Sequence, residues 1–109
     1  MSDVTILSPK LIVCQYSAKA RFHEHWCPGC RMMHQIAVDQ PFRNGARWNF
    51  DGNAEAPTFS PSINCSPNSP AHQCHYFIRA GRIEFCSDCH HALAGQTVDL
   101  PDIPKEHLW

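Results

Sequence analysis

The sequence predicts a mostly β domain (small α+β) with little helix and a β-hairpin near the C-terminus. Two observations lead to this class. Short β-prone runs alternate with turn residues along most of the chain, and proline and glycine interrupt every longer apolar stretch. A chain of 109 residues is too short for two independent cores. We therefore expect residues 1–109 to form a single compact domain, with 101–109 as an extended, proline-broken tail.

The N-terminal half predicts several strands in succession. Residues 4–7, 11–16, 21–26 and 32–38 are β-prone runs, and Ser8-Pro9 separates the first two. Further along, Asn44-Gly45 and Asp51-Gly52 are turn signals. Residues 53–73 contain four prolines, and each removes a backbone donor from any sheet. We expect this stretch to be largely irregular.

The clearest local prediction is a hairpin formed by residues 74–79 and 82–86. Ala80-Gly81 lies between them as a two-residue loop, and glycine tolerates the backbone conformation that such a loop requires. This pairing sets His75 opposite Cys86, so the base of the hairpin gathers several cysteines and histidines. Residues 90–94 predict one short helical turn that ends at Gly95.

Charge and the N-terminal sequence limit the classes of partner and compartment. The net charge is -1, which argues against a protein that grips nucleic-acid phosphates. The first ten residues lack the layout of a signal peptide, and no apolar run reaches membrane-spanning length. We expect a cytoplasmic protein without membrane association. In a reducing compartment, clustered cysteines more often bind metal than form disulfides.

Cysteine and histidine are the unusual components of this chain, at 7 and 8 residues respectively. Cys27-Pro-Gly-Cys30 and Cys86-Ser-Asp-Cys89 are two C-x-x-C pairs, with Cys74 and His75 between them. A tight turn of this spacing supplies two thiolates to a tetrahedral zinc ion without strain. The sequence therefore predicts a Zn²⁺ site shared by the two clusters, and it leaves open which residues complete it.

Other interpretations apply to some of these cysteines. Cys14 and Cys65 read as buried apolar residues. Trp26-Cys-Pro-Gly-Cys30 is also similar to a redox-active pair of the thioredoxin type, but that motif requires a helix after the turn. Residues 31–38 are a poor amphipathic helix, which disfavours redox chemistry.

The chain resembles a family of small bacterial and phage-encoded zinc-knuckle proteins that is known as a domain of unknown function. Some members lie near genes for ubiquitin-like conjugation. The resemblance covers about residues 22–103. It rests on five motifs: Cys27-Pro-Gly-Cys30 with His34, Trp48-Asn-Phe-Asp-Gly, Glu55-Ala-Pro-Thr-Phe-Ser-Pro-Ser62, Cys74-His-Tyr-Phe-Ile, and Asp88-Cys-His-His-Ala-Leu-Ala-Gly-Gln-Thr-Val98.

This resemblance implies a set of ligands and an accessory role, in processing or transfer, in a ubiquitin-like pathway. The family pattern implies Cys27, Cys30, His34, Cys74, His75, Cys89 and His91 as the important positions. From that pattern we expect Cys27, Cys30, Cys74 and Cys89 to hold the metal, with Cys86 and His34 as substitutes. Cys86 is a departure, because the family commonly has an apolar residue there.

Two functions follow as hypotheses. The first is a zinc-dependent hydrolase, peptidase- or isopeptidase-like, that acts on a ubiquitin-like protein or its conjugates. Glu55 is the candidate general base, and His75 and His91 are candidate acid/base groups. A weaker variant makes Cys89 the nucleophile. The second is a non-catalytic zinc-knuckle module that binds a protein partner. Ser60 and Ser62, between prolines, most simply make turns.

Overall fold

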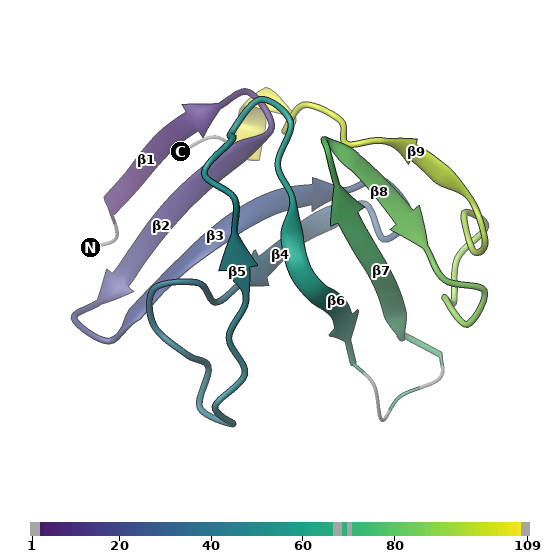
Figure 1. The fold of residues 1–109 in the computed structure, drawn as a ribbon, viewed down its shortest axis with the longest axis horizontal. Coiled ribbons are helices and arrows are strands. Elements are labelled where there is room, and N and C mark those ends of the chain that lie inside the picture. Colours follow the sequence, from purple (N-terminus) through teal and green to yellow (C-terminus); the bar gives the residue numbers. More distant parts are fainter. Residues whose placement is uncertain (1–2, 67–68, 70, 108–109) are drawn as a thin grey trace.

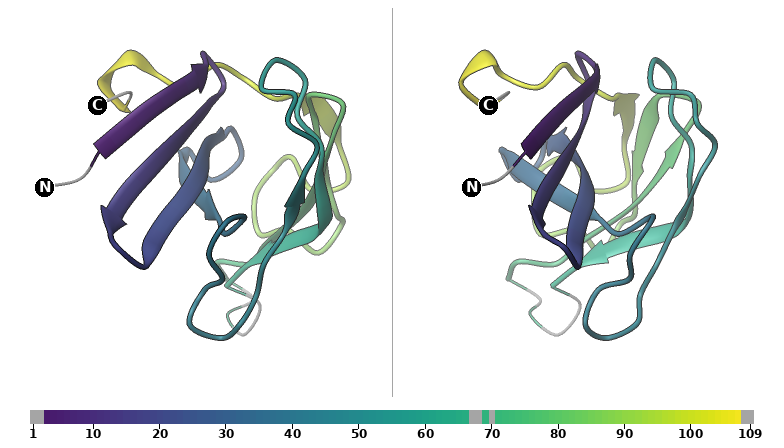
Figure 2. Two further views of the ribbon diagram at one scale, coloured as in Figure 1. Left: turned by 60° about the vertical axis from the view of Figure 1, so that its left-hand side comes forward. Right: turned by 90° about the vertical axis from the view of Figure 1, so that its left-hand side faces the viewer.

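Two antiparallel sheets form the two layers of the computed structural model, which describes residues 3–66, 69 and 71–107 (Figures 1 and 2). The first sheet contains β1 (Asp3–Ser8), β2 (Leu11–Ser17), β3 (Ala20–Cys27) and β4 (Met32–Ile36) in that order. The second contains β5 (Asn49–Phe50), β6 (Phe59–Cys65), β7 (Cys74–Arg79), β8 (Arg82–Phe85) and β9 (Thr97–Asp99). Among the described residues there is no α-helix, only the 3-10 helix η1 (Lys105–His107). The predicted mostly β class is confirmed.

Apolar residues from both sheets meet between the layers. The main core cluster includes Leu11 and Ile36 from the first sheet and Phe59, Tyr76 and Ile78 from the second. Tyr76 is fully buried, and its hydroxyl lies 2.7 Å from His25 Nε2 and 3.0 Å from His34 Nδ1. A hydroxyl can donate one hydrogen bond and accept another, so both buried imidazoles are satisfied.

The strand β7 alternates strictly between the core and the outer face. Cys74, Tyr76 and Ile78 are fully buried, whereas His75 and Phe77 are partly exposed. Its hairpin with β8 has the expected turn, in which Ala80 and Gly81 both adopt positive φ angles of 49° and 78°. The predicted pairing is also confirmed, since the Cys86 amide donates to the His75 carbonyl at 2.9 Å.

The structure corrects the expectation of an irregular stretch over 53–73 at residues 59–65 and agrees with it in the other described residues. Residues 59–65 form β6, which pairs with β7 despite Pro61. The pairing jumps from Phe59–Ile78 to Ile63–Tyr76, so β6 carries extra residues against β7 at this point. Proline is tolerated at such a bulge because the ladder is already interrupted there. The strand could not be predicted from the sequence, because proline is acceptable in β6 only where the pairing with β7 is interrupted.

Residues 91–95 form hydrogen-bonded turns, so the helical turn expected at 90–94 is wrong. These turns end at Gly95 with φ of 78°, where the chain bends back toward β8. In the expected tail, Ile103 is buried against Ile12 and Cys14 on the first sheet, and its amide donates to the Pro9 carbonyl at 2.9 Å. Residues 108–109 of that tail lie outside the described residues.

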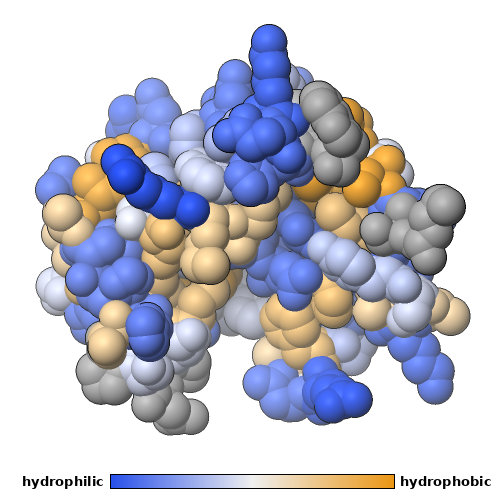
Figure 3. All heavy atoms as spheres, turned by 180° about the vertical axis from the view of Figure 1, so that it is seen from behind, coloured by the Kyte–Doolittle hydropathy of each residue, from blue (hydrophilic) through white to orange (hydrophobic). Residues whose placement is uncertain are grey.

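Large exposed apolar side chains are few and are concentrated on the edge strand β1, which carries Val4, Ile6 and Leu7. Seen from behind, the molecule shows strongly hydrophobic residues only in small groups separated by hydrophilic ones (Figure 3). In the described part of the chain, no helix is long and apolar enough to cross a membrane.

Candidate active site and candidate metal centre

The first two residues of β7 point to opposite faces of the second sheet, and each belongs to a different cluster of polar side chains. Cys74 faces inward and is fully buried. His75 faces outward, with 28% of its side chain exposed. This alternation follows from the two-residue period of a β-strand. It creates one enclosed site and one accessible site from neighbouring residues.

The enclosed site joins both sheets. The sulfurs of Cys27, Cys30 and Cys74 and a ring nitrogen of His91 all lie within 4.8 Å of one another. Cys27 and Cys30 come from the β3–β4 turn, and Cys74 comes from the second sheet. The Cys27 and Cys74 sulfurs are 3.9 Å apart, and His91 Nε2 is 3.3 Å from the Cys74 sulfur.

These distances fit a tetrahedral metal ion. Two sulfurs that each lie about 2.3 Å from zinc at the tetrahedral angle are separated by about 3.8 Å. The observed separation of 3.9 Å between the Cys27 and Cys74 sulfurs matches that value, and it is far too long for a disulfide. Three thiols and one imidazole form a donor set typical of a closed zinc site.

The backbone around Cys27–Cys30 explains how His91 reaches this cluster. The Arg31 amide donates to the Cys27 carbonyl at 2.8 Å and closes the turn, with Arg31 at a positive φ of 57°. A Cβ atom on Gly29 would lie 2.2 Å from the nearest atom of the His91 ring. Only glycine allows this approach. The glycine of the C-P-G-C motif therefore makes room for the imidazole.

Electrostatics in the enclosed site favour one thiolate. The hydrogen bond from Cys74 lowers the pKa of Cys27 to about 7, against the effect of burial. Burial and the neighbouring Cys27 charge raise the pKa of Cys30 to about 12. The pKa of Cys74 is also raised, mainly because its thiol is the donor to Cys27. Without a cation the three sulfurs do not ionise together, and a divalent ion supplies the charge that allows it.

The accessible site is a chain of three side chains on the outer face of the second sheet. The Ser62 hydroxyl lies 3.1 Å from His75 Nε2, and an Asp88 carboxylate oxygen lies 3.4 Å from His75 Nδ1. The hydroxyl, imidazole and carboxylate are thus in the order used for nucleophilic acyl transfer. Both distances permit a hydrogen-bonded relay, with Nδ1–H donating to Asp88 and Nε2 accepting from Ser62.

Neighbouring contacts position each member of this chain. The Trp48 indole N–H donates to the Ser62 carbonyl at 3.0 Å, which fixes the bulged segment of β6. The Gln73 amide donates to the same Asp88 oxygen at 2.7 Å. The ring of Phe77 stacks beside His75 with centroids 6.3 Å apart. Since half of the Asp88 side chain is exposed, the site is open to large ligands.

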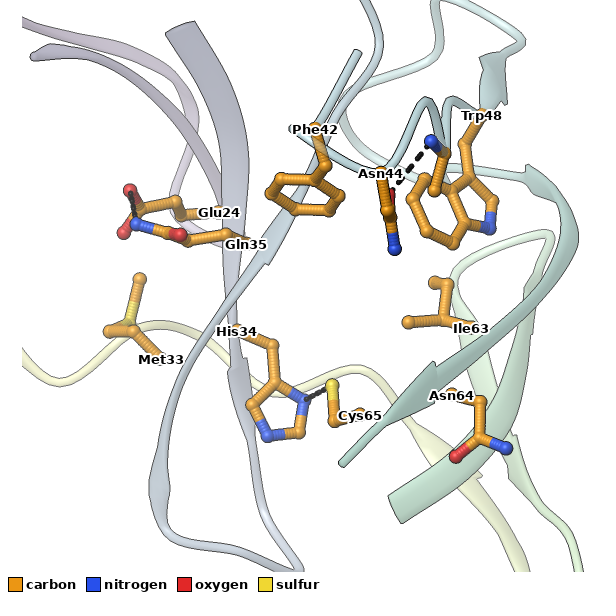
Figure 4. A pocket seen from close by; sticks show the side chains of 11 residues that line it. Glu24, Met33, His34, Gln35, Phe42, Asn44, Trp48, Ile63, Asn64 and Cys65 are labelled. Carbon is orange, nitrogen blue, oxygen red and sulfur yellow. Dashed lines mark hydrogen bonds between the residues drawn. The ribbon is translucent and has the colours of Figure 1, made fainter. Parts of the chain in front are cut away.

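A cavity of about 490 Å³ lies on the other side of β6 (Figure 4). Phe42 and Trp48 line one wall, and His34 and Cys65 line the opposite wall. Ile63 and Cys65 pair with the inward-facing Tyr76 and Cys74, so their side chains point between the sheets, away from the Ser62 hydroxyl. The cavity is therefore separate from the Ser62–His75 contact.

The structure brings together three of the four expected metal ligands: Cys27, Cys30 and Cys74. His91, expected as an acid/base group, occupies the fourth place. Cys89 lies beside this group, in contact with the Cys74 side chain. It also contacts the backbone of His75: its sulfur accepts from the His75 amide at 3.3 Å, and its thiol donates to the His75 carbonyl at 3.0 Å.

The remaining predicted residues lie elsewhere. Cys86 is grouped with His75 and Asp88 on the outer face. His34 is buried against Tyr76, and burial lowers its pKa to about 4. Glu55 is exposed in the loop before β6, where the adjacent Ala56 packs against Gly81 at the far end of β7. The structure does not bring Glu55 to either cluster.

Sequence reasoning named His75 but did not assign Ser62 or Asp88 a chemical role. In the sequence, Ser62 between prolines most simply makes a turn, and Asp88 is a residue inside the 86–89 C-x-x-C pair. The available signal was the hairpin, which sets Cys86 opposite His75 and brings Asp88 close to His75. The placement of Ser62 depends on β6, which the prolines concealed.

The fold and the outer-face site define a small two-layered β protein that carries a serine, a histidine and a carboxylate within hydrogen-bonding distance of one another. The family model described as bacterial ubiquitination-like system serine protease (BubE) matches residues 3–86. The chain therefore belongs to this family. The family description confirms the link to a ubiquitination-like system that the resemblance implied. No curated protein and no solved structure matched the chain.

Proposed function

We propose that this protein is a serine peptidase that hydrolyses an acyl bond at the C-terminus of a ubiquitin-like protein. Ser62 is the nucleophile, His75 is the general base and acid, and Asp88 orients the imidazole. The observation that carries the proposal is the Ser62–His75–Asp88 hydrogen-bonded chain, with separations of 3.1 and 3.4 Å. Membership of a family of ubiquitination-like system serine proteases supports the same chemistry.

The reaction follows from the positions of these atoms. The Ser62 hydroxyl oxygen attacks the acyl carbon while its proton passes to His75 Nε2. His75 then gives this proton to the departing amine or alcohol, and an ester to Ser62 remains. Water hydrolyses the ester by the reverse proton transfers, which releases a carboxylate and restores the serine. Asp88 accepts the hydrogen bond from Nδ1–H throughout and stabilises the imidazolium.

We further propose that Cys27, Cys30, Cys74 and His91 hold a structural zinc ion. Four protein ligands leave no open position for a substrate, as is usual for structural sites. Bound zinc would fasten the β3–β4 turn to β7 and to the 86–95 segment, and so hold the two layers together. It would also fix the start of β7, and with it the backbone of His75.

A catalytic serine together with a structural zinc ion replaces the zinc-hydrolase hypothesis. A zinc-bound nucleophile would require the general base to lie beside the metal, but His75 faces away from the thiols and Glu55 lies at the far end of β7. The family description names a serine protease, which agrees with a hydroxyl nucleophile.

The open outer face suits a protein substrate. Ser62 lies on an accessible sheet surface, and Asp88 is half exposed. An extended C-terminal tail can lie across such a surface, whereas a small substrate would find few walls to hold it. We therefore propose that substrate specificity comes from contacts with the folded part of a ubiquitin-like protein.

The test compares Ser62→Ala with Ser60→Ala on a ubiquitin-like protein that carries a C-terminal extension. Ser60 is an exposed serine two residues away, so it controls for the loss of a hydroxyl in the same segment. We expect Ser62→Ala to reduce kcat/KM by roughly 10³-fold or more and Ser60→Ala to leave it unchanged. Equal activity in both variants would contradict the assignment of Ser62 as the nucleophile. No activity in the unaltered protein would contradict the proposed function and favour a non-catalytic binding module.

A further inference from the structure

One thiol beside the proposed active site has no part in the peptidase mechanism. Cys86 lies directly after β8, where its amide donates to the His75 carbonyl at 2.9 Å. Its sulfur, a ring nitrogen of His75 and a carboxylate oxygen of Asp88 all lie within 4.8 Å of one another. Two members of this group belong to the proposed Ser62–His75–Asp88 chain.

We propose that His75, Cys86 and Asp88 form a second metal site, which binds a thiophilic divalent cation such as zinc and switches the peptidase off. The inhibitory effect rests on the proposed function, whereas the metal site rests on geometry alone. Thiolate, imidazole and carboxylate are all ordinary zinc ligands, and three of them leave one coordination position for water.

The geometry needs only small movements to accommodate the metal. Asp88 Oδ2 is already 3.4 Å from His75 Nδ1, close to the spacing of two ligands on one ion. Half of the Asp88 side chain is exposed, so it can rotate without disturbing the core. Cys86 is partly exposed at the start of the 86–95 segment, which gives an ion access from solvent.

Metal binding here blocks catalysis through the tautomer of His75. Nδ1 is the nitrogen that faces Asp88, so it is the nitrogen that coordinates the ion. A neutral imidazole bound through Nδ1 carries its proton on Nε2. Nε2 then has no lone pair with which to accept the Ser62 proton across the 3.1 Å contact. The ion also occupies the carboxylate that orients the ring.

This site is distinct from the enclosed one. The two sites use opposite faces of β7 and share no residue. The enclosed site offers three thiols and one imidazole, whereas the outer site offers one thiol and is open to solvent. We expect the enclosed site to retain its metal during purification and the outer site to exchange it freely.

The binding test adds Co²⁺ to the zinc-loaded protein and follows the sulfur-to-cobalt charge-transfer absorption in the near ultraviolet. We expect one further equivalent of cobalt with a single thiolate ligand. Cys86→Ser should abolish that absorption, and Cys14→Ser, which removes a thiol on the first sheet, should preserve it. No absorption in the unaltered protein, or the same absorption in Cys86→Ser, would overturn the proposal.

The functional test measures the added zinc concentration that halves peptidase activity, relative to the activity of each purified variant before zinc is added. We expect Cys86→Ser to raise that concentration at least about tenfold over the unaltered protein, because a ligand is lost. Activation by zinc, or equal sensitivity in both proteins, would contradict the switch.

Ser62→Ala separates the two proposals. It removes the proposed nucleophile but none of the three ligands, so it should still bind the second cobalt ion. If the unaltered protein binds cobalt through Cys86 but shows no peptidase activity, the proposed function fails and the metal site stands. If the peptidase is active but the second cobalt does not bind, only the metal switch fails.

Discussion

Each face of β7 adjoins a cluster that contains cysteine and histidine side chains, and the two clusters lie in different environments. On the inner face, three thiols and an imidazole lie together, with Cys27 and Cys74 fully buried and Cys30 and His91 partly exposed. On the outer face, His75 meets a serine and a carboxylate where half of the carboxylate is exposed. Enclosure favours a fixed metal ion, and exposure favours a reaction with a large substrate. Chemical role is thus determined by the face of the strand and not by the residue type.

The comparison also shows why the two sites depend on each other. Cys74 and His75 share one peptide bond, so a metal that holds the Cys74 sulfur also fixes the backbone that presents the imidazole. Cys89 strengthens this link through hydrogen bonds to both backbone groups of His75. We expect changes on the inner face to affect both stability and activity, and changes on the outer face to affect activity alone.

The largest expected effect is the loss of an inner ligand. Cys74→Ala should release the metal and unfold the domain, because metal-binding free energy, on the order of 10 kcal/mol, contributes directly to folding. Zinc content by elemental analysis and thermal unfolding measure the two results. Cys14→Ala is the matched control, since Cys14 is an equally buried thiol outside the cluster. A normal zinc content in Cys74→Ala would remove the metal assignment.

Zinc-edge X-ray absorption distinguishes the two sets of inner ligands. Coordination by three sulfurs and one nitrogen is the expected result, with His91 as the nitrogen donor. Four sulfurs would instead place Cys89 in the site, as the sequence motifs imply.

On the outer face, Asp88→Asn should reduce kcat by roughly 10³-fold without changing the unfolding temperature. An amide can hold the imidazole in the wrong tautomer, and it does not stabilise the imidazolium. The exposed Asp99, whose carboxylate contacts Arg82, offers a matched control as Asp99→Asn. A fall in stability that parallels the fall in kcat would show that Asp88 is structural and would break the contrast between the faces.

A smaller effect on stability is expected for Tyr76→Phe on the inner face. It removes a buried hydroxyl and leaves ring nitrogens of His25 and His34 without that partner. The cost of such unsatisfied groups is about 1–3 kcal/mol of unfolding free energy. Chemical denaturation measures this change. An unaltered unfolding free energy would show that water replaces the hydroxyl.

The smallest expected effect concerns the pH dependence of stability. Burial lowers the pKa of His23, which packs against Phe50 and Phe59, to about 4. The unfolded chain, with a pKa near 6.5, binds this proton first as pH falls. Stability from this group is therefore complete above pH 6.5 and is lost between 6.5 and 4, with a slope of at most about 1.4 kcal/mol per pH unit.

His23→Gln should reduce that slope, because glutamine does not titrate. The measurement is the unfolding free energy of both proteins across this pH range, so that contributions common to both cancel. Identical slopes would show that the pKa of His23 is the same in the folded and unfolded states.

Much of the fold can be predicted from local sequence patterns, because adjacent strands form hairpins whose turns are visible. The 74–86 hairpin is an example, down to the pairing of His75 with Cys86. β6 was missed because Pro61 normally disfavours a strand, and only its bulged pairing with β7 makes proline acceptable. Because Ser62 lies in that bulge, its position beside His75 could not be predicted either.

The candidate metal ligands show the same limit. Cys27 and Cys30 were predicted from their spacing and Cys74 from the family resemblance, and the structure gathers all three. The placement of His91 depends on a close approach to Gly29, which no local pattern reveals. Cys89 has the better spacing for a ligand, but its sulfur contacts the His75 backbone.

The most direct test of the central claim is labelling with a serine-directed fluorophosphonate, followed by mass spectrometry of the labelled peptide. The account predicts a single covalent adduct on Ser62, which disappears in His75→Gln although the serine is still present. Labelling that is absent from the folded, zinc-loaded protein, or that falls on another serine, would contradict the assignment of Ser62, His75 and Asp88 as a peptidase site.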